Sequence, residues 1–222
     1  SAPGFSTSSA EYAVLRLSSL NDSDSVAFIG SPVGTGPESI FVWNGSELVT
    51  VAERNGPFSF LGADLNNAGS VAFATGEGVF VGDGGPLTTI AAAQDLPSAL
   101  DASLTMNDLG QVAFRAGGTI FVGDGTNLTT VADTSGPYLS LNTPMINDAG
   151  IVAFEAVLDA GGNGIFVGSD AVTDRVIAAG DTLNGFSVSS VSIGGINDAG
   201  QIVFFATAGP ATGVYVATAI PV

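Results

Sequence analysis

Short apolar stretches, each only a few residues long, alternate along the whole chain with Gly, Asn, Asp, Ser and Pro. The stretches are rich in Val, Ile, Phe and Thr, which favour β-strands, and the polar breaks contain residues that form tight turns. Long windows of helix-forming residues do not occur, because 31 glycines and 10 prolines are spread among the stretches. The pattern therefore predicts an all-β chain of short strands joined by hairpins.

An eight-residue motif recurs along the chain and divides it into units of about 40 to 50 residues. In one of its fullest forms it reads Asn-Asp-Ala-Gly-Ile-Val-Ala-Phe, at residues 147–154. Repeats of this length are typical of propeller blades and of helical arrays, and the β-forming composition favours blades. The copies lie at residues 21–28, 66–73, 107–114, 147–154 and 197–204.

Each unit contains apolar runs that we expect to form antiparallel strands. The first run is the Val-Ala-Phe segment that ends the motif, the second is centred on an aromatic residue, and the third resembles Leu-Thr-Thr-Val-Ala. Asn-Gly or Asp-Gly dipeptides separate the second run from the third, as in tight hairpins. A further run precedes each motif, at residues 12–17, 58–61, 99–104, 138–141 and 186–193.

Five such units predict a five-bladed β-propeller of four-stranded antiparallel blades, with a β-solenoid as the alternative. More than half of the aromatic residues lie at two repeated positions, which indicates that they form the core. We expect residues 11–222 to form a single repeat domain of five units and residues 1–10 to form an N-terminal arm.

The fifth unit is one strand short in this scheme, because the chain ends where the strand after Tyr215 is expected to begin. An unpaired sheet edge favours pairing with another strand. We therefore expect the N-terminal arm to fill the place, either in its own molecule or in a neighbour by donor-strand addition, which would build a fibre. The residues assigned to this closure are Gly4, Phe5, Ser6, Thr7 and Ser8 of the arm and Val214, Tyr215 and Val216 of the last strand.

Composition excludes several functions. The net charge is −17, with four arginines and no lysine, so the surface repels nucleic acid and anionic membranes. The chain contains no cysteine and no histidine, which excludes thiolate catalysis, Ser-His-Asp chemistry and imidazole metal sites. It also has no apolar run of membrane-spanning length, so we expect no membrane insertion. These features predict a protein that is not an enzyme.

The repeated Asn-Asp-x-Gly segment has two interpretations. It forms a turn, with side chains bonded to nearby main-chain amides and Gly at positive φ, or it builds a ring of carboxylates that collects a cation or a polar ligand. The turn is favoured, because one Asp per unit supplies too few oxygens for calcium. Calcium is therefore the one cofactor left open, with Asp22 and Asp24 as weak candidates, and no metal site is assigned.

Trp43 is the only tryptophan, and it stands where the other units have Gly or Ala. Next to Asn44, an exposed indole would stack on a sugar ring, which makes Trp43 and Asn44 the candidate glycan-binding residues. The other interpretation is that Trp43 fills space where the first and last units meet.

The Asn-x-x-Gly-x-x-Ala-Phe repeats, followed by Gly-Ile-Phe-Val-Gly-Asp-Gly and Leu-Thr-Thr-Val-Ala, resemble the tandem repeats of bacterial secreted proteins whose precursors carry a C-terminal anchoring or sorting tail. The resemblance covers residues 20–217 and implies an extracellular or cell-surface location. It brings no catalytic residues. The ending, residues 219–222, is similar to the junction before such a tail.

These observations lead to one principal hypothesis, a non-catalytic extracellular structural or adhesive protein of a bacterial surface or matrix that associates with itself and polymerises through its terminal strand. The alternative is a glycan-binding propeller lectin, with carbohydrate as partner and pockets repeated between blades.

Overall fold

The structure is a computed structural model, and it describes residues 12–32, 36–54 and 59–218. These residues form β-strands and one short 3-10 helix, η1 (Ala93–Asp95). Each repeat unit forms one sheet, and the paired strands are antiparallel throughout the described part of the chain. Within those ranges no helix has the length and apolar character needed to cross a bilayer.

The strands follow one another in chain order, and we call the sheets blades 1 to 5. Blades 1 to 3 contain β1 (Tyr12–Leu20), β2 (Val26–Pro32), β3 (Ser39–Trp43), β4 (Leu48–Glu53), β5 (Gly62–Leu65), β6 (Val71–Thr75), β7 (Gly78–Gly82), β8 (Thr88–Ala92), β9 (Leu100–Met106), β10 (Val112–Ala116), β11 (Thr119–Gly123) and β12 (Leu128–Asp133). Blades 4 and 5 contain β13 (Tyr138–Leu141), β14 (Met145–Ile146), β15 (Val152–Leu158), β16 (Asn163–Phe166), β17 (Arg175–Ala178), β18 (Thr182–Leu183), β19 (Phe186–Ile196), β20 (Gln201–Ala208) and β21 (Ala211–Thr218).

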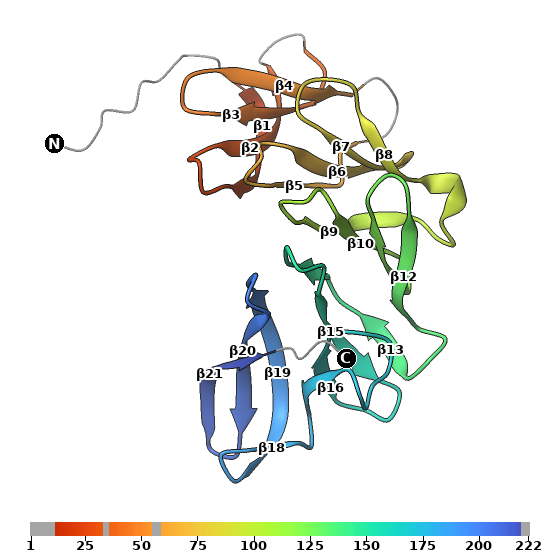
Figure 1. Cartoon of the computed structure of the whole chain (residues 1–222), viewed down its shortest axis with the longest axis vertical. Coiled ribbons are helices and arrows are strands. Elements are labelled where there is room, and N and C mark those ends of the chain that lie inside the picture. The colour runs from red at the N-terminus through yellow and green to blue at the C-terminus, as the bar shows by residue number, and fades with distance from the viewer. Residues whose placement is uncertain (1–11, 33–35, 55–58, 219–222) are drawn as a thin grey trace, which may run out of the picture.

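The five blades follow one another around a common axis, from blade 1 at the top of Figure 1 through blade 3 on the right to blade 5 at the lower left. The strand that precedes each motif is innermost, since β1 contacts β5, β5 contacts β9, β9 contacts β14, and β14 contacts β19. Successive blades thus pack face to face around an axis. The prediction of a five-bladed β-propeller is confirmed, and the solenoid alternative is set aside.

The repeated aromatic residues meet across neighbouring strands in every blade. Phe154 pairs with Phe166, and in blade 5 Phe204 pairs with Tyr215. The ring centroids of the five pairs are 5.4, 5.7, 5.6, 6.1 and 5.8 Å apart in chain order. Such offset contacts stabilise the sheet beyond the burial of ring area. The repeat therefore places one aromatic pair in each blade.

Each blade has two different apolar faces because side chains alternate along a strand. We call the face toward the preceding blade the trailing face, which in blade 4 includes Val152, Phe154 and Phe166. The leading face, toward the next blade, includes Ala153 and Ile165 in blade 4. Four hydrophobic clusters fill the four spaces between consecutive blades, and each joins one leading face to the next trailing face.

One strand lies later than the sequence pattern predicts. The run at 58–61 is not a strand in its described part, and the inner strand of blade 2 is β5 (Gly62–Leu65). A Cβ at Gly62 would lie 2.6 Å from the main-chain oxygen of Ala102, so the absence of a side chain at this glycine lets the inner strands of blades 2 and 3 approach each other. Phe60 precedes the strand but is buried against Phe73, with ring centroids 5.6 Å apart. Phe60 thus supplies core without being part of a strand.

Blade 5, with the strand order β18-β19-β20-β21, differs from blades 1 to 3 because it has an additional short strand, β18, before the strand that precedes the motif. The short strand β18 pairs with the first residues of β19, on the side opposite β20, and β21 is the outermost strand that the described residues provide. In blades 1 to 3 the outermost position belongs to a further strand, β4, β8 or β12. The N-terminal segment Gly4 to Ser8, predicted to fill this position, lies outside the described residues.

Candidate functional site

The repeated Asn-Asp-x-Gly segment forms a tight turn between the inner strand and the next strand of each blade. In blade 4 the Asn147 side-chain oxygen accepts a hydrogen bond from the main-chain N–H of Ile151 at 2.9 Å, and the N–H of Gly150 donates to the carbonyl of Asn147. Gly150 has φ 77°, a conformation that favours glycine. Asp24 occupies this position in blade 1 with φ 58°, so it takes the place that glycine has in the turns of the other blades.

The same asparagines also connect consecutive blades, which the sequence did not reveal. The side-chain amide of each leading Asn donates a hydrogen bond to the main-chain carbonyl of the leading Asn in the next blade. The four distances are 3.0, 3.3, 2.9 and 2.9 Å, from Asn21 to Asn66, Asn66 to Asn107, Asn107 to Asn147 and Asn147 to Asn197. Exact repetition of Asn at this position was the only sequence signal for this contact.

A second set of hydrogen bonds runs beside the first. The main-chain N–H of the residue after each leading Asn donates to the side-chain oxygen of the corresponding residue in the next blade. The distances are 2.8, 2.7, 2.7 and 2.9 Å, from Asp22 to Asn67, Asn67 to Asp108, Asp108 to Asp148 and Asp148 to Asp198. We call these ten residues, the five leading Asn and the five that follow them, the axial relay. Both sets always donate from one blade to the next, so the relay has a direction.

The five turns surround one hollow on the axis, with a volume of about 280 Å³. The axial relay lines it together with one apolar residue from each blade, Leu20, Leu65, Met106, Ile146 and Ile196. The predicted ring of carboxylates thus exists, but three of its members, Asp108, Asp148 and Asp198, accept main-chain hydrogen bonds. Among the described residues, no group of three or more His, Cys, Asp or Glu side chains is placed to hold a metal ion.

Asn67 replaces Asp in the ring at blade 2. Its side-chain amide donates to Asp22 at 3.1 Å and to Asp108 at 2.9 Å, while its side-chain oxygen accepts the N–H of Asp22. A carboxylate at this position would have no N–H to offer and would place a third negative charge between two others. The Asp22 carboxylate, a weak metal candidate by sequence, therefore lies against Asn67 in the relay.

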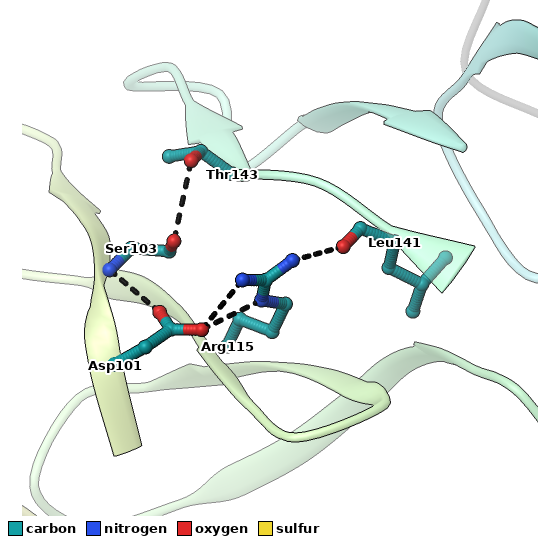
Figure 2. A network of polar contacts seen from close by, with 5 residues as sticks. All are labelled: Asp101, Ser103, Arg115, Leu141 and Thr143. Carbon is teal, nitrogen blue, oxygen red and sulfur yellow. Dashed lines mark hydrogen bonds and ion pairs between the residues drawn. The ribbon is translucent and has the colours of Figure 1, made fainter. Parts of the chain in front are cut away.

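Blades 3 and 4 share a further polar contact, drawn in Figure 2. The Arg115 guanidinium donates to the Asp101 carboxylate at 2.6 and 2.9 Å and also to the main-chain carbonyl of Leu141 in blade 4. Beside it, Thr143 of blade 4 donates to the Ser103 hydroxyl at 3.3 Å. Arg115 follows the Val-Ala-Phe run, a position where polar groups can reach the next blade.

The leading face of blade 5 is exposed. Val203, Phe205, Val214 and Val216 have 37, 52, 60 and 62% of their surface accessible, and we call them the open leading face. At the position of Val203 the other blades have Ala27, Ala72, Ala113 and Ala153, all 0% exposed. Two of the residues predicted for strand closure, Val214 and Val216, belong to this face, whereas Tyr215 points to the other side and stacks on Phe204.

The candidate glycan-binding residues lie at the end of β3. Trp43 is 37% exposed, and Asn44 begins the hairpin turn, where its side-chain oxygen accepts the main-chain N–H groups of Ser46 and Glu47. The indole is thus partly accessible, whereas the oxygen of the Asn44 side chain is already used in the turn.

Carboxylates in turns and between blades have different environments. Two main-chain N–H groups hold the pKa of Asp124 below its usual value, and the turns around Asp133 and Asp170 act in the same direction. Burial between blades 2 and 3 instead raises the pKa of Asp64, although the N–H of Met106 donates to it at 2.9 Å. Burial also raises the pKa of the Tyr138 hydroxyl, which donates to the carbonyl of Gly168.

Comparison with solved structures supports the propeller fold. The chain is similar to the WD40 domain of SCAP from fission yeast, with 13% identity and a TM-score of 0.56, over 92% of this chain and 49% of that one. The chain therefore spans about half the length of that structure. Two structures of the lectin of Aleuria aurantia, one in complex with Fucα1-6GlcNAc and one described as six-bladed with a novel fucose recognition mode, match at 12% identity. Their TM-scores are 0.45 and 0.41, over 93 and 89% of this chain and 77 and 74% of theirs.

Sequence comparison gives a family. No curated protein sequence matches the chain. A family model described as "Family of unknown function (DUF7453)" matches residues 98–220, which is more than half of the chain and includes blade 3, blade 4 and blade 5. The chain therefore belongs to the DUF7453 family.

Proposed function

We propose that this protein is a non-catalytic structural or adhesive component of a bacterial surface or extracellular matrix, and that it associates with itself. The observation that carries the proposal is the open leading face of blade 5. Contiguous exposed apolar residues in a water-soluble domain mark interaction sites, and the corresponding residues in the other four blades are covered by a neighbouring blade.

The use of the axial carboxylates supports a non-catalytic role. Asp108, Asp148 and Asp198 accept hydrogen bonds from main-chain N–H groups of the preceding blade, and Asp22 accepts one from the Asn67 amide. Three of the four axial carboxylates therefore share one repeated geometry, in which each accepts a hydrogen bond that links its blade to the preceding blade.

The extracellular location rests on the resemblance of the repeats to those of secreted bacterial proteins and on the acidic composition, with a net charge of −17. Labelling of intact source cells with an antibody against this chain tests it. Detection only after the cells are lysed would contradict a surface location.

Sedimentation velocity and electron microscopy over a range of concentrations test self-association. We expect the Phe205→Asn/Val214→Thr variant to lose the association of the wild-type chain, because it replaces half of the open leading face by polar groups. A matched control is Leu139→Asn/Val172→Thr, at exposed apolar residues of blade 4 and its loop. Wild-type protein that remains monomeric at every concentration would refute the proposal.

Polymerisation through the terminal strand is the finer form of this proposal. The outer edge of β21 has no strand beside it among the described residues, and residues 4–8 are the segment proposed to pair there. Deletion of residues 1–10 should then abolish fibres seen by electron microscopy, and a synthetic peptide of residues 1–10 should restore protection of β21 amides from hydrogen exchange. Fibres that form equally well after the deletion would exclude the arm as the donor strand.

Carbohydrate binding is the second candidate function, and the partly exposed indole of Trp43 beside the Asn44 turn favours it. A glycan array with wild-type protein and a Trp43→Ala variant tests it. Binding that Trp43→Ala abolishes is the expected result, with Phe186→Ala as a control at another exposed aromatic residue. Absence of binding to every sugar would remove this candidate.

A further inference from the structure

Asparagine followed by glycine is a chemically reactive dipeptide, because glycine has no side chain to shield its nitrogen from the preceding side-chain amide. The chain contains four such pairs, at residues 44–45, 55–56, 163–164 and 184–185. The pair at 55–56 lies outside the described residues, and the other three lie in different surroundings. Three identical dipeptides thus differ only in what the fold places around them.

Asn44 begins the hairpin turn between β3 and β4, and three donors hold its side-chain oxygen. The N–H groups of Ser46 and Glu47 lie 3.0 and 2.8 Å from Oδ1, and the Ser46 hydroxyl lies 3.0 Å from it. In such a turn the side chain folds back over the peptide bond that follows, toward the nitrogen of Gly45. The three donors also polarise the carbonyl and stabilise the negative charge that develops on Oδ1 when Cγ is attacked.

The attacking and leaving groups of this turn are unhindered. A Cβ at Gly45 would meet no atom within 4 Å, and the hydrogen bonds of the described residues include none from the Gly45 N–H. Within the same ranges no acceptor binds Nδ2 of Asn44, and the residue is exposed. Asp83 and Asp124, at the same hairpin position, are exposed as well, although the glycines that follow them pack on the outer strand of the preceding blade. The exposure of Asn44 is therefore a property of the hairpin.

Asn163 has the opposite environment, because it is fixed within β16. Its amide donates to the Glu155 carboxylate and to the carbonyl of Val191, and its side-chain oxygen accepts the N–H of Val191. Gly164 is paired with a strand on each side. Neither the amide nor the following nitrogen is free to move in this pair.

Asn184 is exposed but lacks the three donors. Asn184 and Gly185 form the two-residue turn between β18 and β19, with φ 53° and 83°, and Leu183 pairs with Phe186 directly beside it. These angles are those of a tight type I′ hairpin turn. No donor among the described residues reaches the side-chain oxygen of Asn184.

From these differences we infer that Asn44 is a site of spontaneous modification, at which the folded chain promotes loss of the side-chain amide. The nitrogen of Gly45 gives its proton to solvent and bonds to Cγ of Asn44, while the Cγ–Nδ2 bond breaks and the amide leaves, with a proton from solvent, as ammonia. The product is a five-membered succinimide ring. Water then adds to one of the two ring carbonyls and breaks its bond to the ring nitrogen, which leaves aspartate or isoaspartate at position 44. The inference goes beyond the proposed function and does not depend on self-association.

The two products have different consequences for the hairpin. Aspartate at position 44 keeps the turn, because Asp124 accepts the N–H groups of Thr126 and Asn127 in the corresponding turn of blade 3. These N–H groups hold the pKa of Asp124 low, and a carboxylate that stays ionised resists further attack by a main-chain nitrogen. Isoaspartate instead adds a methylene to the main chain and disturbs the register in which Trp43 pairs with Leu48.

Peptide mass spectrometry of the folded wild-type chain tests the inference. The protein is kept in mildly alkaline buffer made with water labelled with heavy oxygen and is then digested in ordinary water with trypsin, which releases residues 17–54 as one peptide. We expect loss of the amide at position 44 with uptake of one heavy oxygen, at least about tenfold faster than at Asn163 or Asn184. An isoaspartyl methyltransferase assay should detect isoaspartate, which only the succinimide route produces. In urea the three pairs should react at similar rates.

A variant of the turn tests the role of the donors. Ser46→Ala removes one of the three and should slow the reaction in the folded chain by roughly two- to tenfold, the contribution of one hydrogen bond. Thr126→Ala, at the corresponding position of blade 3, is the matched control and should leave the rate at Asn44 unchanged.

Three results would overturn the inference. In the folded chain, Asn184 could react as fast as Asn44, which would show that exposure alone decides the rate. Asn44 could react more slowly in the folded chain than in urea, which would show that the turn protects it. Aspartate could form without isoaspartate, which would show direct hydrolysis by water in place of the succinimide.

Discussion

Blade 4 and blade 5 have the same repeat but different surroundings at their leading faces. Ile165 of blade 4 is fully buried against blade 5, whereas Val214, at the same repeat position in blade 5, is 60% exposed. Both residues lie in the strand that follows the Val-Ala-Phe run. The difference shows that the repeat builds two complementary faces in every blade, and that only the presence of a following blade decides whether a leading face becomes core.

The largest expected difference between these blades is in stability. Replacing Ile165 with Ala should lower the free energy of unfolding by about 2 to 5 kcal/mol, because it leaves a cavity between two blades. The same change at Val214 should cost less than about 0.5 kcal/mol in the monomer, since its side chain is exposed. Urea unfolding at low protein concentration measures both. Similar losses at the two positions would show that the leading face of blade 5 is also covered in solution.

The axial relay provides a second comparison, between Asn147 and Asn197. Asn147→Ala removes a turn acceptor and the donor to the carbonyl of Asn197, and Asn147 is buried. We expect a loss of about 2 to 3 kcal/mol, as for buried polar groups that lose their partners. Asn197→Ala removes only contacts within one turn and should cost about 1 kcal/mol in the monomer. Equal losses in urea unfolding would contradict the role of the relay between blades.

The Arg115 contact joins blades 3 and 4 at a partly exposed site, so a smaller effect is expected. Arg115→Met should reduce stability by about 1 kcal/mol, because it removes the bonds to Asp101 and to the carbonyl of Leu141. Arg175→Met is the matched control, since Arg175 pairs with Asp181 at 3.4 Å within one unit. The Arg175→Met variant should lower the urea concentration at the midpoint of unfolding less than Arg115→Met does. A larger effect at Arg175 would argue against a contribution of Arg115 between blades.

The smallest expected effects concern pH, and they have opposite signs for two carboxylates. The pKa of Asp64 is raised in the folded chain by burial between blades, so its ionisation destabilises the fold progressively as pH rises from the ordinary value through the raised value. The pKa of Asp124 is lowered by turn N–H groups, so its contribution is present above the ordinary value and is lost as pH falls through the lowered one.

Carboxyl NMR titration measures the two pKa values, and urea unfolding across the same pH range measures their consequence. Relative to Asp64→Asn, the wild-type chain should lose stability as pH rises. Relative to Asp124→Asn, it should gain stability as pH rises through the lowered pKa. A titration of Asp64 below that of Asp124 would show that burial between the blades does not dominate at Asp64.

Much of the fold could be predicted from the sequence because it depends on local chemistry. The Val-Ala-Phe runs and the aromatic runs form adjacent strands, and their aromatic residues meet in pairs such as Phe154 and Phe166. The strand before the second motif was predicted wrongly at 58–61, because Phe60 is buried in a connection against Phe73 and the strand begins only at Gly62. An apolar run alone does not distinguish a strand from a buried connection.

The candidate site could be predicted only in part. Exact repetition indicated that Asn147 and its equivalents form turns. The hydrogen bonds of such a turn join residues no more than four positions apart, so a local pattern can indicate them. Their bonds to the next blade join residues 40 to 50 positions apart, and no local pattern indicates them. The partner of Arg115 in blade 4 was hidden for the same reason.

The sequence by itself determined that the chain forms five similar units, that each has a tight Asn-containing turn, and that alternating side chains give every unit two apolar faces. Only the tertiary structure decided the direction of the axial relay and which leading face stays uncovered. The physical reason is that alternation fixes the side of a strand on which a residue lies but not what packs against that side. Val203 and Ala153 share one repeat position, yet Val203 is exposed and Ala153 is buried, since among the described residues another blade packs against Ala153 but none packs against Val203.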